Sequence, residues 1–190
     1  MTSSAAPALR ADARRNRERV LAAAREQFTQ RGLDVHMEQI ARAAGVGVGT
    51  VYRHFPTKED LVHALADERF AYFAEKARAA LDDPDPWNGF CDLIRESARV
   101  VAEDRALSEA MDQHAGMCAE SAAKVRLIEL SSELIERAKA SDQMRADFTA
   151  QDIPSLMRGL ARATAPQDSG PPAMSSERYV EIMLAGLRHR

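Results

Sequence analysis

Residues 40–61, IARAAGVGVGTVYRHFPTKEDL, constrain the fold of this chain more than any other segment. Apolar side chains recur there every three or four residues, which is the spacing of one face of an α-helix. Gly45 and Pro56 interrupt this pattern, because glycine is a frequent helix terminator and proline cannot continue a helix. The segment therefore predicts two short helices, at about 37–44 and 48–54, joined by a turn.

Two short helices joined by such a turn are typical of the helix-turn-helix, whose second helix enters the major groove of DNA. Val51 and Phe55 lie four residues apart and share a face, which we expect to pack against the first helix, with Val46 beneath the turn. Other side chains of the second helix would then face outward. These are Gly49, Thr50, Tyr52, Arg53 and His54.

The outward residues have the chemistry of a DNA contact. Thr50, Tyr52 and His54 can hydrogen-bond phosphates, and Arg53 can reach a phosphate or the edge of a guanine. Taken singly, Tyr52 would be a packing residue and His54 a surface or capping residue. Their joint placement on one helix favours contact with DNA by the helix as a unit.

A long helix is expected to follow, from Thr57 to about Leu81. Thr57 can cap its free N–H groups, with Asp60 three residues further on. Lys58 lies at the same N-terminus, where its charge and the helix dipole together favour a phosphate.

Basic residues also begin the first expected helix, which starts at Asp12 after a flexible arm over residues 1–11. Arg14, Arg15 and Arg17 could grip the DNA backbone or reach into the minor groove. A solvated helix start is the alternative for these three residues.

Composition and periodicity extend the helical prediction to the whole chain. Aromatic residues make up 5% and hydrophobic residues 45% of the 190 residues, and no alternating strand pattern is present. We therefore predict an all-α protein of about nine helices. Their expected ranges are 12–31, 37–44, 48–54, 57–81, 87–102, 105–114, 118–141, 151–165 and 176–188.

Charge is unevenly distributed along the chain. The net charge is −3, but residues 1–60 hold ten Lys and Arg against seven Asp and Glu, which leaves the remainder acidic. This asymmetry suggests that DNA is met at the N-terminal end. The sequence has neither a secretory leader nor an apolar run long enough for a membrane span, so we expect a cytoplasmic protein that does not bind membranes. Cys91 and Cys118 have no metal-ligand spacing and are expected to be buried apolar residues.

The segment resembles the N-terminal DNA-binding domain of TetR-family transcriptional regulators over roughly residues 15–65. The matching residues are Ile40-Ala41, Gly45-Val46, Thr50-Val51-Tyr52, His54-Phe55 and Thr57-Lys58. Two positions depart from the family pattern. His36 stands where a Ser or Thr cap is frequent, and Gly47 where Ser, Thr or Asn is frequent, which affects local stability or operator choice.

The resemblance implies a role for each matching position. Tyr52, His54 and Lys58 would hold phosphates, and Arg53 would read a base, with Val48 and Gly49 beside it. The domains would be a helix-turn-helix domain over 12–56 and a helical effector-binding and dimerisation domain over 57–190. The last two helices, expected at 151–165 and 176–188, would pair with their symmetry mates in a homodimer, although their apolar stripes could instead pack within one subunit.

The resemblance also implies a ligand cavity between the middle helices. Taken singly, each candidate lining residue is more typical of plain core. The candidates are Phe73, Trp87, Phe90, Ile94, Met111, Met117, Leu127 and Met157. Gln113, His114 and Arg126 are nearby polar groups that could orient a ligand. No metal or other cofactor is expected.

We therefore interpret the chain as a sequence-specific transcriptional regulator, a repressor that an unknown small-molecule effector releases from a palindromic double-stranded operator. It has none of the nucleophile, phosphate-loop or metal-ligand motifs of common enzymes, so we expect no enzymatic activity. One alternative is a helical ligand-binding or enzymatic bundle with a vestigial helix-turn-helix. Another is a constitutive DNA-binding regulator without a ligand.

Overall fold

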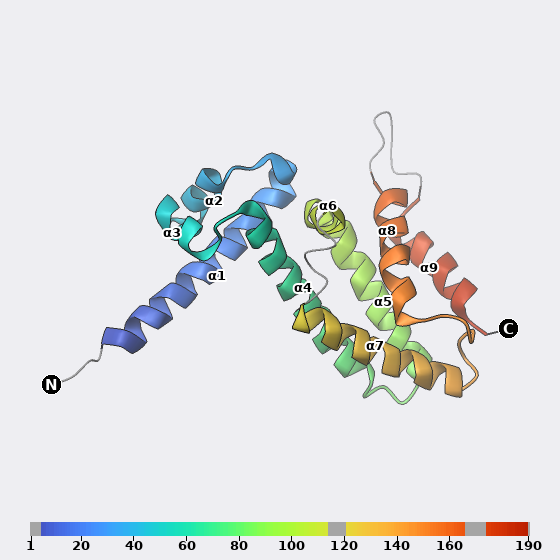
Figure 1. Ribbon diagram of the computed structural model, residues 1–190. Coiled ribbons are helices and arrows are strands. Elements are labelled where there is room, and N and C mark those ends of the chain that lie inside the picture. The colour runs from blue at the N-terminus through green and yellow to red at the C-terminus, as the bar shows by residue number, and fades with distance from the viewer. Residues whose placement is uncertain (1–4, 114–120, 166–173, 190) are drawn as a thin grey trace.

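The computed structural model describes residues 5–113, 121–165 and 174–189. Within these ranges the chain forms nine α-helices and two short 3₁₀ helices (Figure 1). In chain order these elements are α1 (Ala5–Arg31), η1 (Gly32–Asp34), α2 (Met37–Ala44), α3 (Val48–His54), α4 (Lys58–Ala80), α5 (Pro86–Glu103), α6 (Arg105–Gln113), α7 (Ala122–Ala140), η2 (Ala150–Asp152), α8 (Ile153–Ala163) and α9 (Ser176–Leu187).

The prediction of an all-α protein with about nine helices is confirmed for the described residues. The one β-type pairing found in them is an isolated bridge between Met144 and Arg188. Among the described helices, none is both long enough and apolar enough for a membrane crossing.

Side-chain caps determine where several of these helices begin. Thr57 Oγ1 accepts a hydrogen bond from the Asp60 amide at 3.1 Å, and the Asp60 carboxylate accepts one from the Thr57 amide at 3.0 Å. Asp85 caps α5, which has a proline at its first position, and Ser175 caps α9. Each cap pairs backbone donors that the first helical turn leaves without an intrahelical partner.

The largest difference from the expected ranges lies at the N-terminus. The flexible arm was expected to extend to residue 11, but α1 already begins at Ala5, and residues 1–4 lie outside the described part. Residues 5–13 are rich in alanine, the strongest helix former. Pro7 is tolerated because it falls in the first turn, where its missing N–H has no intrahelical acceptor.

An N-terminal core joins α1, α2, α3, the first half of α4 and α6. The apolar stripe of α1 is fully buried there, with Val20, Leu21 and Phe28 at 0–1% exposure. Leu61 and Leu65 of α4 and Leu107 of α6 belong to the same core. The core therefore extends past residue 56, where the sequence placed the end of the first domain.

A second core fills the space between α4, α5, α7, α8 and α9. Its centre contains Phe90, Ile94 and Leu134, each fully buried, and α4 runs from the N-terminal helices to α7 (Figure 1). Cys91 is buried in this core as expected, whereas Cys118 lies outside the described residues.

The turn between α2 and α3 depends on glycine at position 45. Gly45 adopts φ +62°, which L side chains rarely adopt, and a Cβ there would lie 2.8 Å from Arg19 Nη2. We expect Gly45→Ala to lower the free energy of unfolding by about 1–2 kcal/mol, because of the left-handed backbone. Urea denaturation followed by circular dichroism measures this change.

Gly49→Ala is the matched control. Gly49 lies within α3, and a Cβ there meets no atom within 4 Å, so this variant should keep or raise stability. Equal unfolding free energies for the two alanine variants would contradict the role given to the Gly45 conformation.

Candidate functional site

The first candidate site is the outer surface of α3, which lies on the side of the N-terminal helices that is remote from α5–α9 (Figure 1). Its inner face is closed, since Val51 is 0% and Phe55 2% exposed. Val46 is half-buried against the same core, as expected. The outer residues that the sequence singled out lie together on the opposite side. Val48, Gly49, Tyr52 and Arg53 are exposed, and Thr50 and His54 are half-exposed.

Two arginines of α1 contact the helix pair α2 and α3. Arg19 donates from Nη2 to the Gly45 carbonyl at 3.1 Å, which ties α1 to the turn. The Arg17 guanidinium lies 5.3 Å from the centre of the Phe55 ring, where it makes a cation–π contact. Arg17 thus stabilises the C-terminal end of α3 through the buried residue Phe55.

Tyr52 has a partner that the sequence did not reveal. Its hydroxyl donates to Glu38 Oε1 on α2 at 3.3 Å. Partial desolvation and the adjacent Glu38 carboxylate raise the pKa of Tyr52, so its hydroxyl keeps its proton at neutral pH. Glu38 lies in the first turn of α2, and its negative charge is therefore part of the same surface.

Lys58 lies in the first turn of α4, next to the end of α3 in the chain. Its ammonium is 5.8 Å from the centre of the Phe28 ring. The structure therefore brings Lys58 to the helix N-terminus where the sequence placed it. Arg15 is exposed on α1 and ion-paired with Asp12.

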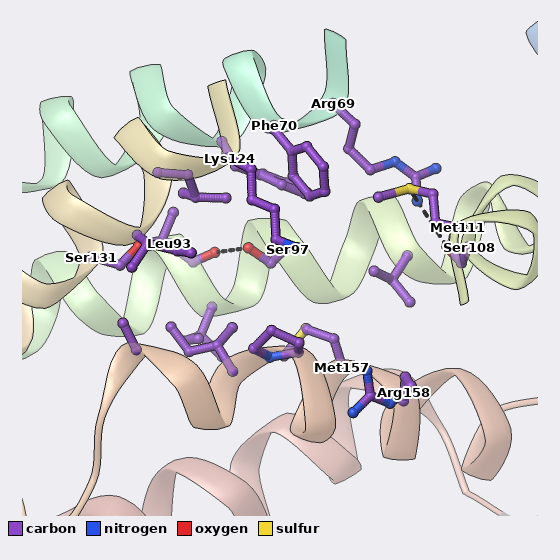
Figure 2. Close-up of a pocket in the computed structure, with 18 of the residues that line it drawn as sticks. Arg69, Phe70, Leu93, Ser97, Ser108, Met111, Lys124, Ser131, Met157 and Arg158 are labelled. Carbon is purple, nitrogen blue, oxygen red and sulfur yellow. Dashed lines mark hydrogen bonds between the residues drawn. The ribbon is translucent and has the colours of Figure 1, made fainter. Parts of the chain in front are cut away.

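The second candidate site is a cavity of about 230 Å³ bounded by α4, α5, α6, α7 and α8 (Figure 2). Most of its lining is apolar, with a few charged and hydroxyl groups. The lining residues are Arg69, Phe70, Phe73, Leu93, Ile94, Ser97, Val101, Ser108, Met111, Asp112, Lys124, Leu127, Ile128, Ser131, Ala150, Ile153, Pro154, Met157, Arg158 and Ala161.

Five of the eight residues expected at a ligand cavity line this one. They are Phe73, Ile94, Met111, Leu127 and Met157.

Trp87 and Phe90 do not line the cavity, and Met117 lies outside the described residues. Phe90 is fully buried in the core, with its ring edge against Phe148 at 5.8 Å, and Trp87 lies under the Arg188 guanidinium. Both residues therefore pack in the second core, which also includes residues of α9. Of the three nearby polar groups, Gln113 and Arg126 are exposed, and His114 lies outside the described part.

A buried ion pair lies at one wall of the cavity. Arg69 on α4 is 7% exposed, and its Nη2 lies 2.8 Å from Asp104 Oδ2, just before α6. Arg69 Nη1 also donates to Ser108 Oγ at 2.9 Å and contacts Met111 Sδ at 3.7 Å. Burial lowers the pKa of Arg69, and Asp104 opposes that shift, so the guanidinium remains charged at neutral pH.

Sequence reasoning missed the charged lining of the cavity. Arg69 lies between Glu68 and Phe70, and Arg158 lies between Met157 and Gly159, so nothing local marks either arginine as part of a cavity wall. On α7 a signal was available, because Lys124, Leu127 and Ser131 recur at the spacing of one helix face.

These features define a helix-turn-helix protein with a second helical domain that contains a largely apolar cavity. Residues 20–65 match the family model for bacterial regulatory proteins of the tetR family, and residues 85–189 match the SbtR-like transcriptional regulator C-terminal domain. The second match covers more than half of the chain. The chain belongs to the TetR family.

Solved structures resemble the chain over nearly its whole length. A TetR regulator from Mycobacterium vanbaalenii is 36% identical, covers 95% of this chain and 99% of its own, and gives a TM-score of 0.65. SCO0520 from Streptomyces coelicolor is 27% identical, covers 91% of this chain and 98% of its own, and gives a TM-score of 0.63.

Similarity to the curated relatives is confined to one part of the chain. The HTH-type transcriptional regulator SAUSA300_2515 of Staphylococcus aureus is 34% identical over 76 residues, which is 40% of this chain and 41% of that protein. The chain thus matches about two fifths of the length of these curated relatives.

The buried ion pair has a measurable effect on stability. Asp104→Asn removes the charge that compensates Arg69, and we expect the free energy of unfolding to fall by about 3 kcal/mol or more, because an unpaired buried charge remains. Chemical denaturation measures the change. The matched control is Asp92→Asn, which breaks an exposed pair with Arg95 and should change stability by about 1 kcal/mol at most. Similar losses in both variants would contradict this interpretation.

Proposed function

We propose that this protein is a homodimeric transcriptional repressor that binds a palindromic DNA operator through α3 and is released by a small-molecule effector. The observation that carries the proposal is the outer face of α3. Its inner side is fully buried, while Tyr52 and Val48 are 42% and 38% exposed next to Arg53. A helix held on one side and open on the other can enter the major groove.

Roles within this surface follow from chemistry. Arg53 is proposed to read a base edge, with Val48 and Gly49 alongside, because a guanidinium can donate two hydrogen bonds to a guanine. Thr50, Tyr52, His54, Lys58 and, on α1, Arg15 are proposed to contact phosphates. DNA recognition would then be confined to residues 12–56 and the start of α4, and effector binding and dimerisation to the rest of 57–190.

Dimerisation is proposed to use α8 and α9. Ile182 is 49% exposed, and Ala185 and Gly186 lie on the same face of α9 and are also exposed. The small side chains one turn after Ile182 would allow a symmetry-related helix to approach closely. Reading two half-sites about one DNA turn apart requires such a two-fold arrangement.

Release by the effector is proposed to act through α6. Leu107 and Ala110 of α6 belong to the N-terminal core, Ser108 and Asp112 line the cavity, and Met111 contacts both. An occupant that shifts α6 or α4 would therefore alter the separation of the two recognition helices, which must stay near ~34 Å on DNA. The effector must bind the wrongly spaced state more tightly, since only differential affinity shifts a population.

The cavity favours this model over a constitutive regulator without a ligand, and the open face of α3 favours it over a bundle with a vestigial helix-turn-helix. We propose a cytoplasmic location, where the operator would be, and assign no catalytic step to the chain.

DNA binding is tested by selecting bound fragments from random sequence and measuring their affinities by fluorescence anisotropy. Arg53→Ala should weaken the selected site by about 1–3 kcal/mol and relax the preference at one position in each half-site. Lys58→Ala should weaken all sequences alike and reduce the slope of log affinity against log salt by about 1 per subunit.

Arg95→Ala, on the exposed face of α5, is the matched control and should bind the operator like the wild type. Failure of the wild-type protein to select any sequence would overturn the proposed function. Unchanged specificity in Arg53→Ala would overturn the role given to that residue.

The proposed dimer is tested by Ile182→Glu. A charge at this exposed α9 position should dissociate the dimer and weaken binding to a two-half-site operator by at least about tenfold, because each subunit would then bind one half-site alone. Sedimentation equilibrium gives the mass. Val125→Glu, at a residue that is 48% exposed on α7, should leave the dimer intact. A dimeric Ile182→Glu protein would place the interface elsewhere.

A further inference from the structure

The polar lining of the cavity restricts the chemistry of what can bind there. Apolar side chains form most of the wall, including Phe70, Phe73 and Met157, so an occupant must be largely hydrocarbon. The side chains in the lining that carry a full charge are three cations and one carboxylate. They are Arg69, Lys124, Arg158 and Asp112.

Two of these three cations already have acidic partners. Arg69 is ion-paired with Asp104 at 2.8 Å, and Arg158 Nη1 lies 3.9 Å from Asp112 Oδ1. Lys124 differs, since its ammonium forms no ion pair with any residue in the described ranges. In Figure 2 its side chain extends from α7 across the cavity towards Ser97 on α5.

The Lys124 side chain is half-buried, and an ammonium beside an apolar wall is favoured by an anion that compensates its charge. Ser97 does not direct its proton to an occupant, because its hydroxyl donates to the Leu93 carbonyl at 2.8 Å. The hydroxyl oxygen keeps a lone pair for a donor. One anionic group on an occupant would compensate Lys124, and a second anionic group would find no unpaired cation among the described lining residues.

We propose that the effector is an apolar molecule with a single carboxylate, which pairs with the Lys124 ammonium while its hydrocarbon part lies against α4 and α8. This inference rests on the proposed function, because it names the chemical class of the effector. The cavity of about 230 Å³ is larger than the ~150 Å³ cavity that holds benzene in an engineered protein. An aromatic acid or a medium-chain fatty acid would therefore suit it.

The test uses the full-length protein and two pairs of probes that differ only in charge. Octanoate is compared with octanamide and benzoate with benzamide, by isothermal titration calorimetry. At least one carboxylate should bind about tenfold or more tightly than its amide, because a hydrogen bond between charged groups is stronger than a neutral one. The two pairs distinguish a chain-like from a ring-like effector.

Variants then assign the effect to one side chain. Lys124→Met keeps most of the side-chain length and removes the charge, so the carboxylate should bind no better than its amide. Lys124→Arg keeps the charge and should retain most of the preference. Lys139→Met, on the same helix but paired with Glu136 outside the cavity, should bind all probes like the wild type.

The operator affinity of each variant without probe is measured first. Three results, each obtained with intact DNA binding, would overturn the proposed effector class and leave the repressor model in place. These are no binding of either carboxylate, equal affinity for each acid and its amide, and an undiminished preference for the acid in Lys124→Met. If the wild-type protein binds no operator in the absence of probe, the proposed function itself is overturned.

Discussion

The position of α6 depends on one buried ion pair. Arg69 and Asp104 are both largely withdrawn from water, and Arg69 also donates to Ser108 and contacts Met111 on α6. Removing such charges from water is unfavourable unless each is compensated, so the pair tolerates little separation. This constraint fixes α6 against the middle of α4, the helix that joins the two cores.

The consequence is that α6 works as a shared wall. Successive residues on a helix point about a quarter-turn apart, so Leu107 and Ser108 face different compartments of the protein. Leu107 is buried among the N-terminal helices, whereas Ser108 lines the cavity. Met111 is the most deformable part of the cavity wall on this helix, because its side chain has three rotatable bonds. A small occupant would therefore be accommodated by Met111, and a larger one would have to displace α6 itself.

Periodicity and capping chemistry were sufficient to predict most of the fold from the sequence. The Thr57 cap, the Gly45 turn and the apolar stripes of α2 and α3 are local features, and the structure has them where the sequence placed them. The extended start of α1 was missed because Ser, Ala and Pro together were interpreted as a flexible arm, although alanine favours a helix.

The candidate sites could be predicted only in part, because they depend on contacts between distant residues. A helical stripe shows which side chains are buried, but it does not show whether they line a cavity or pack against a neighbouring ring. The sequence therefore could not show that Met157 lines the cavity while Phe90 lies in the core. An ion pair between distant residues, such as Arg69 and Asp104, can be predicted only when the packing of the helices that carry them is known. The same holds for the Arg17 contact with Phe55, since both arginine and phenylalanine are compatible with several environments.

The contact between Tyr52 and Glu38 changes the expected energetics of the surface that we propose binds DNA. A tyrosine hydroxyl has one proton, so Tyr52 can donate to Glu38 or to a phosphate but not fully to both. Binding DNA would therefore exchange one anionic acceptor for another, and the net gain from this hydrogen bond is small. Glu38 must in addition approach the negative duplex. In the proposed complex the affinity of this end of the protein would accordingly come from its cationic groups, chiefly Arg53 and Lys58 in the first turn of α4.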